Sequence, residues 1–491
     1  MSRDLIDLVQ RLGEPRVLVL GDVMLDRYIW GDAERISQEA PVILLHADKR
    51  EERLGGASSV ATMLRALGAE VSLAGVLGAD SDGERVRRML DELGIDHQAI
   101  LTDAGRPTTV KERYIGRAQQ RHPQQIIRVD YEARHPLSAS LESEFKRVVE
   151  DQLLRADIVL ISDYDKGVCV PSVLGPLIDS GRRQGARTLA DPIRGKDYRK
   201  YHYCSTITPN RLEAGLATGR NIRTPDDALL AASQLLRDLN LEAAIITLDK
   251  DGIALVHQDG RRQIFGTRAR QVYDITGAGD MVMSTLGMAL AAGADYDAAI
   301  RLANIAGGLE VEKIGVATIT RDELLRDILH HGLTPNQKIL PREAMLKEVE
   351  SRRRLGQRIA FTNGCFDVLH AGHIQYLQEA REQADALIVG LNSNSSVRAL
   401  KGPNRPIHSE NDRSLVLAGL QAVDCVTVFN ETTPLALIEM IRPDVLVKGA
   451  DYQKSAVVGA TFVESYGGRV YLAPLREGLS STRILQRLGA A

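Results

Sequence analysis

Short runs of apolar residues that end in polar or glycine-containing turns recur along the chain, and such runs are typical of buried β-strands. They occupy residues 16–22, 158–162, 244–248, 358–364, 386–391 and 445–447. Between them, apolar positions recur at helical spacing, as in residues 58–67 and 228–239. Strands that alternate with helices predict mostly parallel sheets covered by helices, which is an α/β fold.

A turn-rich segment, residues 330–341, interrupts this pattern with two prolines and one glycine and is the best candidate for a linker. On each side of it, the regular pattern opens with an apolar strand that runs into a glycine-containing turn. We therefore expect two domains of unequal size. The expected bounds are 1–332 for the first domain, 333–355 for the linker and first helix, and 356–491 for the second domain.

Composition places the chain among ordinary globular proteins, because 44% of its 491 residues are hydrophobic and 26% are charged. The net charge of −3 argues against a dedicated nucleic-acid binder. The four cysteines are scattered, which favours neither a zinc module nor a disulfide framework. The start lacks a signal-peptide pattern, and no apolar run is long enough for a membrane span. We expect a cytoplasmic protein without membrane or nucleic-acid partners.

The sharpest chemical motif of the first part is Asp-Ile-Thr-Gly-Ala-Gly-Asp at residues 274–280, before an apolar stretch. A glycine turn running into a helix presents successive backbone N–H groups, which bind anions. A carboxylate there can accept a proton from a hydroxyl while the N–H groups hold the transferred phosphoryl group. Taken alone, the motif favours a plain helix cap. As a catalytic site it has Asp280 as the base and an anion hole of Gly277, Ala278 and Gly279.

Further segments give the first part a resemblance to the ribokinase (PfkB) family of carbohydrate kinases. They are Gly21-Asp22, the glycine pair in residues 54–61, Asn210-Arg-Leu-Glu213, residues 247–252 and Asn304. The resemblance implies the sugar-binding residues Asp22, Asp26, Gly55, Gly56, Lys111 and Arg113. It implies the ATP-binding residues Asn210, Arg211, Leu212, Glu213, Thr247, Gly252 and Asn304. Ser59 departs from the family, which usually has Asn at that position.

Asn210 and Glu213 are three residues apart and would share one face of a helix. Such a pair could order water bound to Mg²⁺, an ion that keeps several waters and few protein ligands. The resemblance thus implies ATP as phosphoryl donor and Mg²⁺ held by Glu213 through water. The alternative from the residues alone is a solvated helix start after Pro209.

Residues 21–31, 35–41 and 111–130 look closely like the heptose-phosphate kinase branch of this family. Cationic side chains suit a phosphorylated sugar because they pair with its charge. Lys111 and Arg113 are therefore the candidates for the distal phosphate, and the alternative is surface charge on an edge strand. The loop at 116–125 is longer than in that branch, so its geometry is not predicted.

The second part carries the longer motif Phe-Thr-Asn-Gly-Cys-Phe-Asp-Val-Leu-His-Ala-Gly-His at residues 361–373. It places His370 and His373 at a helix start, where imidazoles and the helix N-terminus can bind phosphate oxygens. Attack on the α-phosphorus of a nucleoside triphosphate needs such charge stabilisation and no covalent enzyme group. A zinc pair is the weaker alternative, because no third His or Cys neighbour is evident.

This motif and downstream residues 392–396, 401–402, 447–452 and 478–484 resemble the cytidylyltransferase-like superfamily, which has a Rossmann-like fold. The implied catalytic residues are His370 and His373. The implied nucleotide-binding residues are Asn363, Gly364, Phe366, Asp367, Lys401, Arg413, Lys448, Ser481 and Thr482.

A sugar kinase joined to a nucleotidyltransferase resembles the bifunctional heptose enzymes of lipopolysaccharide core synthesis. By resemblance, the first domain phosphorylates O1 of D-glycero-β-D-manno-heptose 7-phosphate, and the second converts heptose 1-phosphate and ATP into ADP-heptose and pyrophosphate. A separate phosphatase must remove the 7-phosphate between the steps. Family members often dimerise through a strand flap, so we expect a homodimer. The alternatives are a different sugar kinase fused to a cytidylyltransferase for a polyol phosphate, and a non-catalytic sugar-phosphate sensor.

Overall fold

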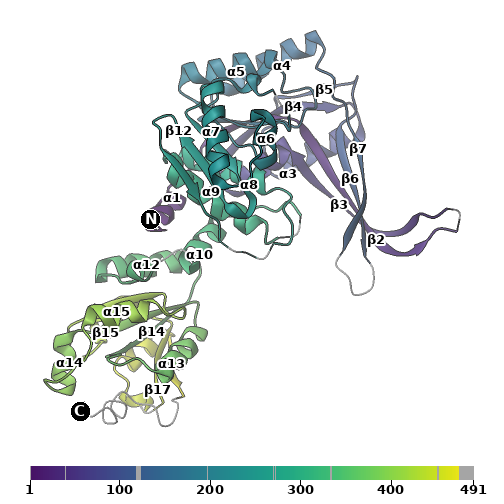
Figure 1. Ribbon diagram of the computed structural model, residues 1–491. Helices are drawn as coiled ribbons and strands as arrows, with labels where there is room; N and C mark the ends of the chain where they lie inside the picture. The colour runs from purple at the N-terminus through teal and green to yellow at the C-terminus, as the bar shows by residue number, and fades with distance from the viewer. Residues whose placement is uncertain are drawn as a thin grey trace. The chain divides into compact units, whose positions relative to one another are not determined.

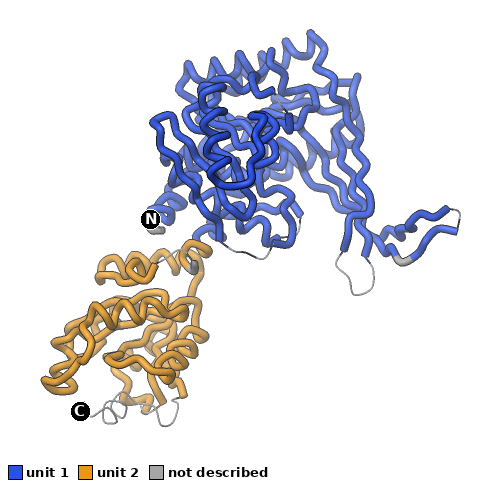
Figure 2. Tube along the Cα trace, in the orientation of Figure 1, with its two compact units in different colours: residues 1, 3–325 blue, residues 2, 326–491 orange. Residues whose placement is uncertain are grey.

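The computed structural model describes residues 2–38, 40–117, 123–195, 197–268, 270, 272–313, 315–331, 334–450 and 453–474. The chain forms two compact units, residues 3–325 and residues 326–491 (Figure 2). Among the described residues, no helix is long and apolar enough to cross a membrane.

The larger unit is built on a nine-stranded sheet of order β13-β12-β11-β10-β9-β8-β1-β4-β5. All its pairs are parallel except β11–β12 and β12–β13. The strands predicted near residues 16, 158 and 244 are β1, β8 and β11. The strand bounds are β1 Arg16–Gly21, β4 Glu70–Gly78, β5 Ile100–Asp103, β8 Ile158–Ser162, β9 Arg187–Asp191, β10 Thr206–Ile207, β11 Ala243–Thr247, β12 Ile253–His257 and β13 Arg262–Phe265.

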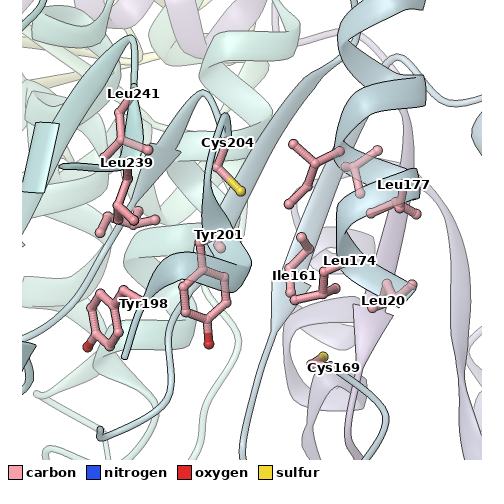
Figure 3. Close-up of a cluster of buried hydrophobic side chains, with 14 of the residues drawn as sticks. Leu20, Ile161, Cys169, Leu174, Leu177, Tyr198, Tyr201, Cys204, Leu239 and Leu241 are labelled. Carbon is pink, nitrogen blue, oxygen red and sulfur yellow. The ribbon is translucent and has the colours of Figure 1, made fainter. Parts of the chain in front are cut away.

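Helices cover this sheet, and their apolar faces form its core. Leu20 and Ile161 of the sheet lie in one buried cluster with Leu174 and Leu177 of α5 (Figure 3). Helix α8 is buried along residues 280–290, as expected of a helix that is apolar all round. The helix bounds are α1 Ser2–Gln10, α2 Ala57–Ala66, α3 Ser81–Glu92, α4 Ala139–Leu153, α5 Pro171–Gln184, η1 Arg199–Tyr201, α6 Arg211–Thr218, α7 Pro225–Leu239, η2 Asp249–Asp251, α8 Ala278–Ala291, α9 Tyr296–Glu310 and α10 Arg321–His331.

A second, four-stranded sheet of order β3-β2-β6-β7 extends from the larger unit, and we refer to it as the flap sheet (Figure 1). Its strands are β2 Val23–Ile36, β3 Ile43–Gly56, β6 Thr109–Arg117 and β7 Gln124–Tyr131. Strand β6 lies between β2 and β7, so Lys111 and Arg113 are not on an edge strand. Trp30, the single tryptophan of the chain, lies on β2 opposite Lys49 and Ile115.

The smaller unit is built on a five-stranded parallel sheet of order β16-β15-β14-β17-β18. Its strands are β14 Ile359–Gly364, β15 Ala386–Asn392, β16 Cys425–Phe429, β17 Val445–Gly449 and β18 Arg469–Ala473. Its helices are α11 Pro335–Lys338, α12 Arg342–Arg354, α13 Ala371–Glu382, α14 Asn394–Lys401, α15 Glu410–Ala418, α16 Leu435–Ile441, η3 Lys454–Ala456 and α17 Ala460–Ser465. The predicted α/β fold class is confirmed for both units.

The segment expected to be the linker and first helix, 333–355, packs on the smaller sheet. Leu340 donates its backbone N–H to Val426 O at 2.9 Å, and Met345 and Val349 of α12 lie in the smaller unit's core. The division between the units falls at 325/326, inside α10, rather than at 332/333. The exact domain bounds therefore stay a prediction.

Candidate active sites

The base predicted for phosphoryl transfer, Asp280, lies in the first turn of α8. Gly277 caps this helix with φ 101°, a conformation that L side chains rarely adopt. A β-carbon there would also lie 2.9 Å from Oε1 of Glu310, so a larger residue would in addition displace that carboxyl group. Ala278 and Gly279 are the first helical residues, which places the proposed anion hole and the carboxylate in one turn.

The Asp280 carboxylate is only 6% exposed. Burial raises its pKa to about 6, and the hydroxyl groups of Ser59 and Tyr164 oppose this rise. Tyr164 donates its hydroxyl to Oδ1 at 3.2 Å, and the nearby Ser59 hydroxyl makes no hydrogen bond of good geometry with the described residues. At neutral pH most Asp280 side chains are therefore ionised and able to accept a proton.

Asp22 lies at the carboxyl end of β1 and is buried. Its Oδ2 accepts the backbone N–H groups of Tyr164 at 2.7 Å and Lys166 at 3.1 Å, while Oδ1 has no hydrogen-bond partner among the described residues. Burial, then the charge of Asp163, raises the pKa of Asp22 to about 6. A buried carboxylate oxygen without a donor is suited to a sugar hydroxyl.

The flap sheet carries the other five predicted sugar residues. Asp26 faces Lys111 in the β2–β6 register, and its Oδ1 lies 2.5 Å from Nη1 of Arg113. The backbone of Gly55 passes so close that a β-carbon there would lie 2.4 Å from Oδ2 of Asp26. Gly56 follows with φ 57° as the N-cap of α2.

Two cations on this sheet contact aromatic rings. Lys111 Nζ lies 4.7 Å from the ring centroid of Tyr164, and the guanidinium of Arg113 lies 5.2 Å from that of Tyr28. Burial lowers the pKa of Lys111. The distal-phosphate role expected for Lys111 and Arg113 stays a prediction, because Arg113 is also paired with Asp26.

Asn210 and Glu213 form a reciprocal capping box at the start of α6. Asn210 Oδ1 accepts the backbone N–H of Glu213 at 3.0 Å, and Glu213 Oε2 accepts that of Asn210 at 2.9 Å. The helix start expected as the alternative is therefore present in the structure. The capping box uses Oε2 of Glu213 and leaves its Oε1 available for bound water. Burial raises the pKa of Glu213.

Of the other predicted ATP residues, Thr247 contacts this helix start directly. Thr247 pairs with Asn210 in an isolated β-bridge, and Gly252 has φ 96° at the end of η2. Asn304 donates to the backbone oxygen of Gly266 at 3.0 Å. Arg211 is engaged with Asp251 at 2.6 Å, and Leu212 is 51% exposed.

Three residues of this site were missed from the sequence: Tyr164, Asp191 and Glu310. Asp191 ends β9, and burial, then the charges of Asp280 and Glu213, raises its pKa well above its usual value. It therefore lies near both the base and the proposed magnesium residue. Oxygen donors of this kind suit Mg²⁺, and a divalent cation would offset their mutual repulsion.

A second acidic group in the larger unit, formed by Asp22, Asp163 and Cys169, has its ligand atoms within 4.8 Å of one another. Lys200 Nζ already lies 2.5 Å from Asp163 Oδ2 and supplies positive charge there. Lys200 thus pairs with one of the two carboxylates, and the charge of Asp163 still contributes to the raised pKa of Asp22.

In the smaller unit, His370 and His373 meet at the start of α13. Their rings stack with centroids 3.9 Å apart, and the ring of Phe366 lies 5.3 Å from that of His373. Burial lowers the pKa of His370, and burial followed by the charges of His370 and Lys401 lowers that of His373 to about 4. Both imidazoles are neutral at pH 7, and the Nδ1 atom of each is buried with no hydrogen-bond partner in the part of the chain that the structure describes.

The strand ends beside the histidines carry further predicted residues. Lys448 at β17 donates to Oδ1 of Asn363 at 2.5 Å, and Asn363 and Gly364 end β14. Phe366 has a positive φ of 43°, which turns its ring into the core beneath His373. The turn at Phe366 therefore places the Phe366 ring against the ring of His373.

Asp367 and Arg413 are both engaged by protein groups, and Nε of Arg405 also lies 2.5 Å from Oδ2 of Asp367. Asp367 accepts the backbone N–H groups of Ile407 at 2.7 Å and His408 at 3.2 Å. Arg413 donates to the backbone oxygens of Cys365 at 2.6 Å and Asn392 at 2.8 Å. These contacts brace the loops around the histidines, and direct phosphate contacts by the two residues stay a prediction.

Lys401, at the end of α14, is exposed and close enough to lower the pKa of His373. It is thus the cation beside the histidines. Ser481 and Thr482 lie outside the described residues.

Comparisons with known proteins agree with this geometry. Residues 14–323 match the pfkB family carbohydrate kinase model, and residues 361–487 match the cytidylyltransferase-like model. The Bifunctional protein HldE of Syntrophotalea carbinolica is 43% identical over 482 residues, covering 98% of this chain and 97% of that protein. The protein of the same name from Wolinella succinogenes is 44% identical over 476 residues, covering 96% and 98%.

Solved structures show the fold of the larger unit. Arabidopsis thaliana ribokinase complexed with ribose and ATP superposes with a TM-score of 0.52 at 18% identity, covering 64% of this chain and 99% of that chain. Phosphofructokinase-2 from Escherichia coli in complex with potassium gives 0.53 at 18% identity, covering 64% and 98%. The ribokinase-like fold predicted for this unit is confirmed.

Proposed function

The chain belongs to the pfkB family of carbohydrate kinases and, over almost its full length, to the bifunctional HldE proteins, and from that membership we propose how its two sites divide the work. The larger unit phosphorylates O1 of D-glycero-β-D-manno-heptose 7-phosphate with ATP. The smaller unit transfers AMP from ATP to heptose 1-phosphate, which gives ADP-heptose and pyrophosphate for lipopolysaccharide core synthesis.

The observation that carries the kinase assignment is the ionised Asp280 in the same helical turn as Gly277, Ala278 and Gly279. The sugar hydroxyl gives its proton to the carboxylate while its oxygen bonds to the γ-phosphorus and the bond to ADP breaks. Backbone N–H groups at the helix start hold the negative charge of the transferred group. Asp22 and Asp26 are positioned to hold the sugar.

The transferase reaction needs no base, because a phosphate oxygen of heptose 1-phosphate is already an anion. That oxygen bonds to the α-phosphorus of ATP as the bond to pyrophosphate breaks. Neutral His370 and His373 each donate one N–H to phosphate oxygens, and Lys401 adds charge. Stabilisation of charge on the phosphoryl centre is the whole contribution required of the protein.

Mg²⁺ is the proposed cofactor of the kinase reaction. Glu213, through water, and Asp191 would hold it near the phosphates, because their carboxylates lie close enough to interact. When bound, the ion neutralises charge on the transferred phosphoryl group.

We also propose a separate phosphatase, because the kinase product bears phosphates at both ends and the transferase substrate bears one. Both sites described above build phosphate esters or anhydrides, and neither is arranged to hydrolyse the 7-phosphate. The enzyme would work in the cytoplasm, where ATP is available.

A homodimer is proposed from the outer part of the flap sheet. Four apolar side chains there are between 45% and 72% exposed: Ile36, Val42, Ile43 and Leu44. A second copy that covers these side chains would remove them from water. Sedimentation of Ile43→Glu should then show a monomer, and an unchanged oligomer would exclude this surface.

Product analysis tests the function. Wild-type enzyme with heptose 7-phosphate, ATP and Mg²⁺ should accumulate the 1,7-bisphosphate, and ADP-heptose should form only after a phosphatase is added. Asp280→Asn should lose at least about 100-fold in bisphosphate formation and keep the transferase. His373→Ala should lose at least about 100-fold in ADP-heptose formation and keep the kinase. A preference for CTP would favour the polyol-phosphate alternative, and inactivity of both units would favour the sensor.

A further inference from the structure

Tyr164 lies in no motif singled out by the sequence, yet it touches two carboxylates of the kinase site. It follows β8 in a loop, where its backbone N–H donates to Asp22 Oδ2 at 2.7 Å. Its phenol hydroxyl donates to Asp280 Oδ1 at 3.2 Å. One residue therefore connects the proposed sugar-holding carboxylate with the base.

Lys111 adds a third connection to the same side chain. Its ammonium lies 4.7 Å from the Tyr164 ring centroid, within the range of a cation–π contact. Because Lys111 faces Asp26 across β2 and β6, the ring also links the flap sheet to α8. The charge of Asp280, then burial, holds the pKa of Tyr164 well above its usual value, so its hydroxyl remains a donor.

We propose that Tyr164 is a positioning residue of the kinase reaction: its hydroxyl holds Oδ1 of Asp280 so that Oδ2 faces the sugar hydroxyl. The inference rests on the proposed heptose kinase function. In the reaction, the sugar proton passes to Oδ2 of Asp280 as the new O–P bond forms and ADP leaves. Tyr164 keeps its own proton throughout, and its hydrogen bond stabilises the ionised carboxylate against burial.

Tyr164→Phe tests this role because it keeps the ring, and with it the Lys111 contact, and removes only the hydroxyl. A hydrogen bond to a charged group implies a fall of roughly tenfold in the single-turnover phosphorylation rate. The KM for heptose 7-phosphate should stay unchanged. The acid limb of the pH–rate profile should move up by about one pH unit, because the lost donor raises the pKa of Asp280.

Tyr296→Phe is the matched control. It removes a buried tyrosine hydroxyl of the same unit that donates to a carboxylate oxygen at the same distance, Glu242 Oε2 at 3.2 Å, and Glu242 belongs to neither proposed site. Its rate and pH profile should match those of the wild type. Site-specific 3-fluorotyrosine at position 164 is a stronger donor and should move the acid limb downward.

A wild-type rate and pH profile for Tyr164→Phe overturns the proposal. So does a loss confined to KM, because that loss describes a substrate contact. An upward shift with fluorotyrosine also overturns it. If wild-type enzyme makes no heptose bisphosphate, the proposed function fails instead, and the same profiles are compared with the sugar phosphate that it does phosphorylate.

Discussion

Asp280 and Glu310 are both buried carboxyl groups with raised pKa values, but only Asp280 has a hydroxyl donor. Burial raises the pKa of Glu310 to about 8, opposed by the backbone N–H of Ala317 and enhanced by the charges of Asp274 and Asp280. Its Oε2 has no hydrogen-bond partner among the described residues. At neutral pH Glu310 is thus mostly uncharged beneath the anion hole, whereas Asp280 is mostly charged beside it.

The Asp280 charge costs folding stability. Its pKa is 3.8 when free and about 6 when folded, so the folded state binds more protons between these values and loses stability as pH rises through them. Asp280→Asn should therefore stabilise the larger unit by about 3 kcal/mol at pH 8 and by nothing at pH 3.5. Chemical denaturation at the two pH values measures this, with exposed Asp238→Asn of α7 as control. Equal free energies of unfolding for Asp280→Asn and the wild type at pH 8 would show that burying the Asp280 charge does not reduce stability.

Glu310→Gln should change stability in a pH window that extends higher. The pKa of Glu310 rises from 4.5 to about 8, so the wild type loses stability as pH rises through that range. The variant, which resembles the protonated acid, should be more stable than wild type by about 5 kcal/mol at pH 9 and equal to it at pH 4. Glu312→Gln, which removes a carboxylate paired with Arg270, serves as control in the same denaturation series. A variant that is less stable at pH 9 would contradict a neutral Glu310.

At the scale of single residues, the sequence predicted those that lie in motifs and missed those that depend on tertiary contacts. Asp280, His370 and His373 were identifiable because each lies in a local pattern of glycine and polar residues. Tyr164 and Glu310 carry no such pattern, and their proximity to the base arises only when β8, α8 and α9 pack together. A tyrosine two residues after the end of a buried parallel strand was the one available signal, because carboxyl ends of strands form sites in α/β folds.

At the scale of elements, alternation predicted the parallel strands but not the flap sheet. Strand β3 includes six consecutive charged residues, 48–53, which a hydrophobicity pattern assigns to a loop. In the structure these charges pair with side chains of neighbouring strands. Glu52, for example, lies 3.0 Å from Arg27 of β2, which also lies 3.1 Å from Glu112 of β6. Long-range pairing compensates for the missing apolar face, and no local pattern records it.

Helix α12 contains a buried charge, Arg352, with one partner in the same helix and one, Asp424, outside it. Arg352 is 0% exposed, and its Nε donates to Glu348 at 2.8 Å while Nη1 lies 3.4 Å from Asp424. Glu348→Ala removes one of these partners, and breaking a buried pair costs about 3 kcal/mol. Glu350→Ala on the exposed face of α12 should change stability by less than about 0.5 kcal/mol. Denaturation monitored by loss of transferase activity should give a lower midpoint for Glu348→Ala than for Glu350→Ala. Coincident midpoints would show that the buried pair does not contribute to stability.

At the scale of the whole molecule, the position of α11 and α12 decides where the chain can be divided. A fragment of residues 334–491 keeps Leu340, Met345, Val349 and Arg352 with the sheet on which they pack. A fragment of residues 356–491 loses all four and exposes the sheet face beneath them. The longer fragment should unfold cooperatively and form ADP-heptose, and the shorter one should not. Circular dichroism melts and pyrophosphate release measure both, and a stable, active shorter fragment would make α12 dispensable.

The position of Trp30 gives the protein a natural optical reporter. As the single tryptophan, on β2 of the flap sheet, it is the only indole that can emit in either unit. Intrinsic fluorescence should therefore follow sugar-phosphate binding at the flap in the intact bifunctional chain. The histidine site contains no tryptophan, so binding of heptose 1-phosphate and ATP there adds no indole signal, in the wild type or in His373→Ala. The two half-reactions can therefore be distinguished without labels.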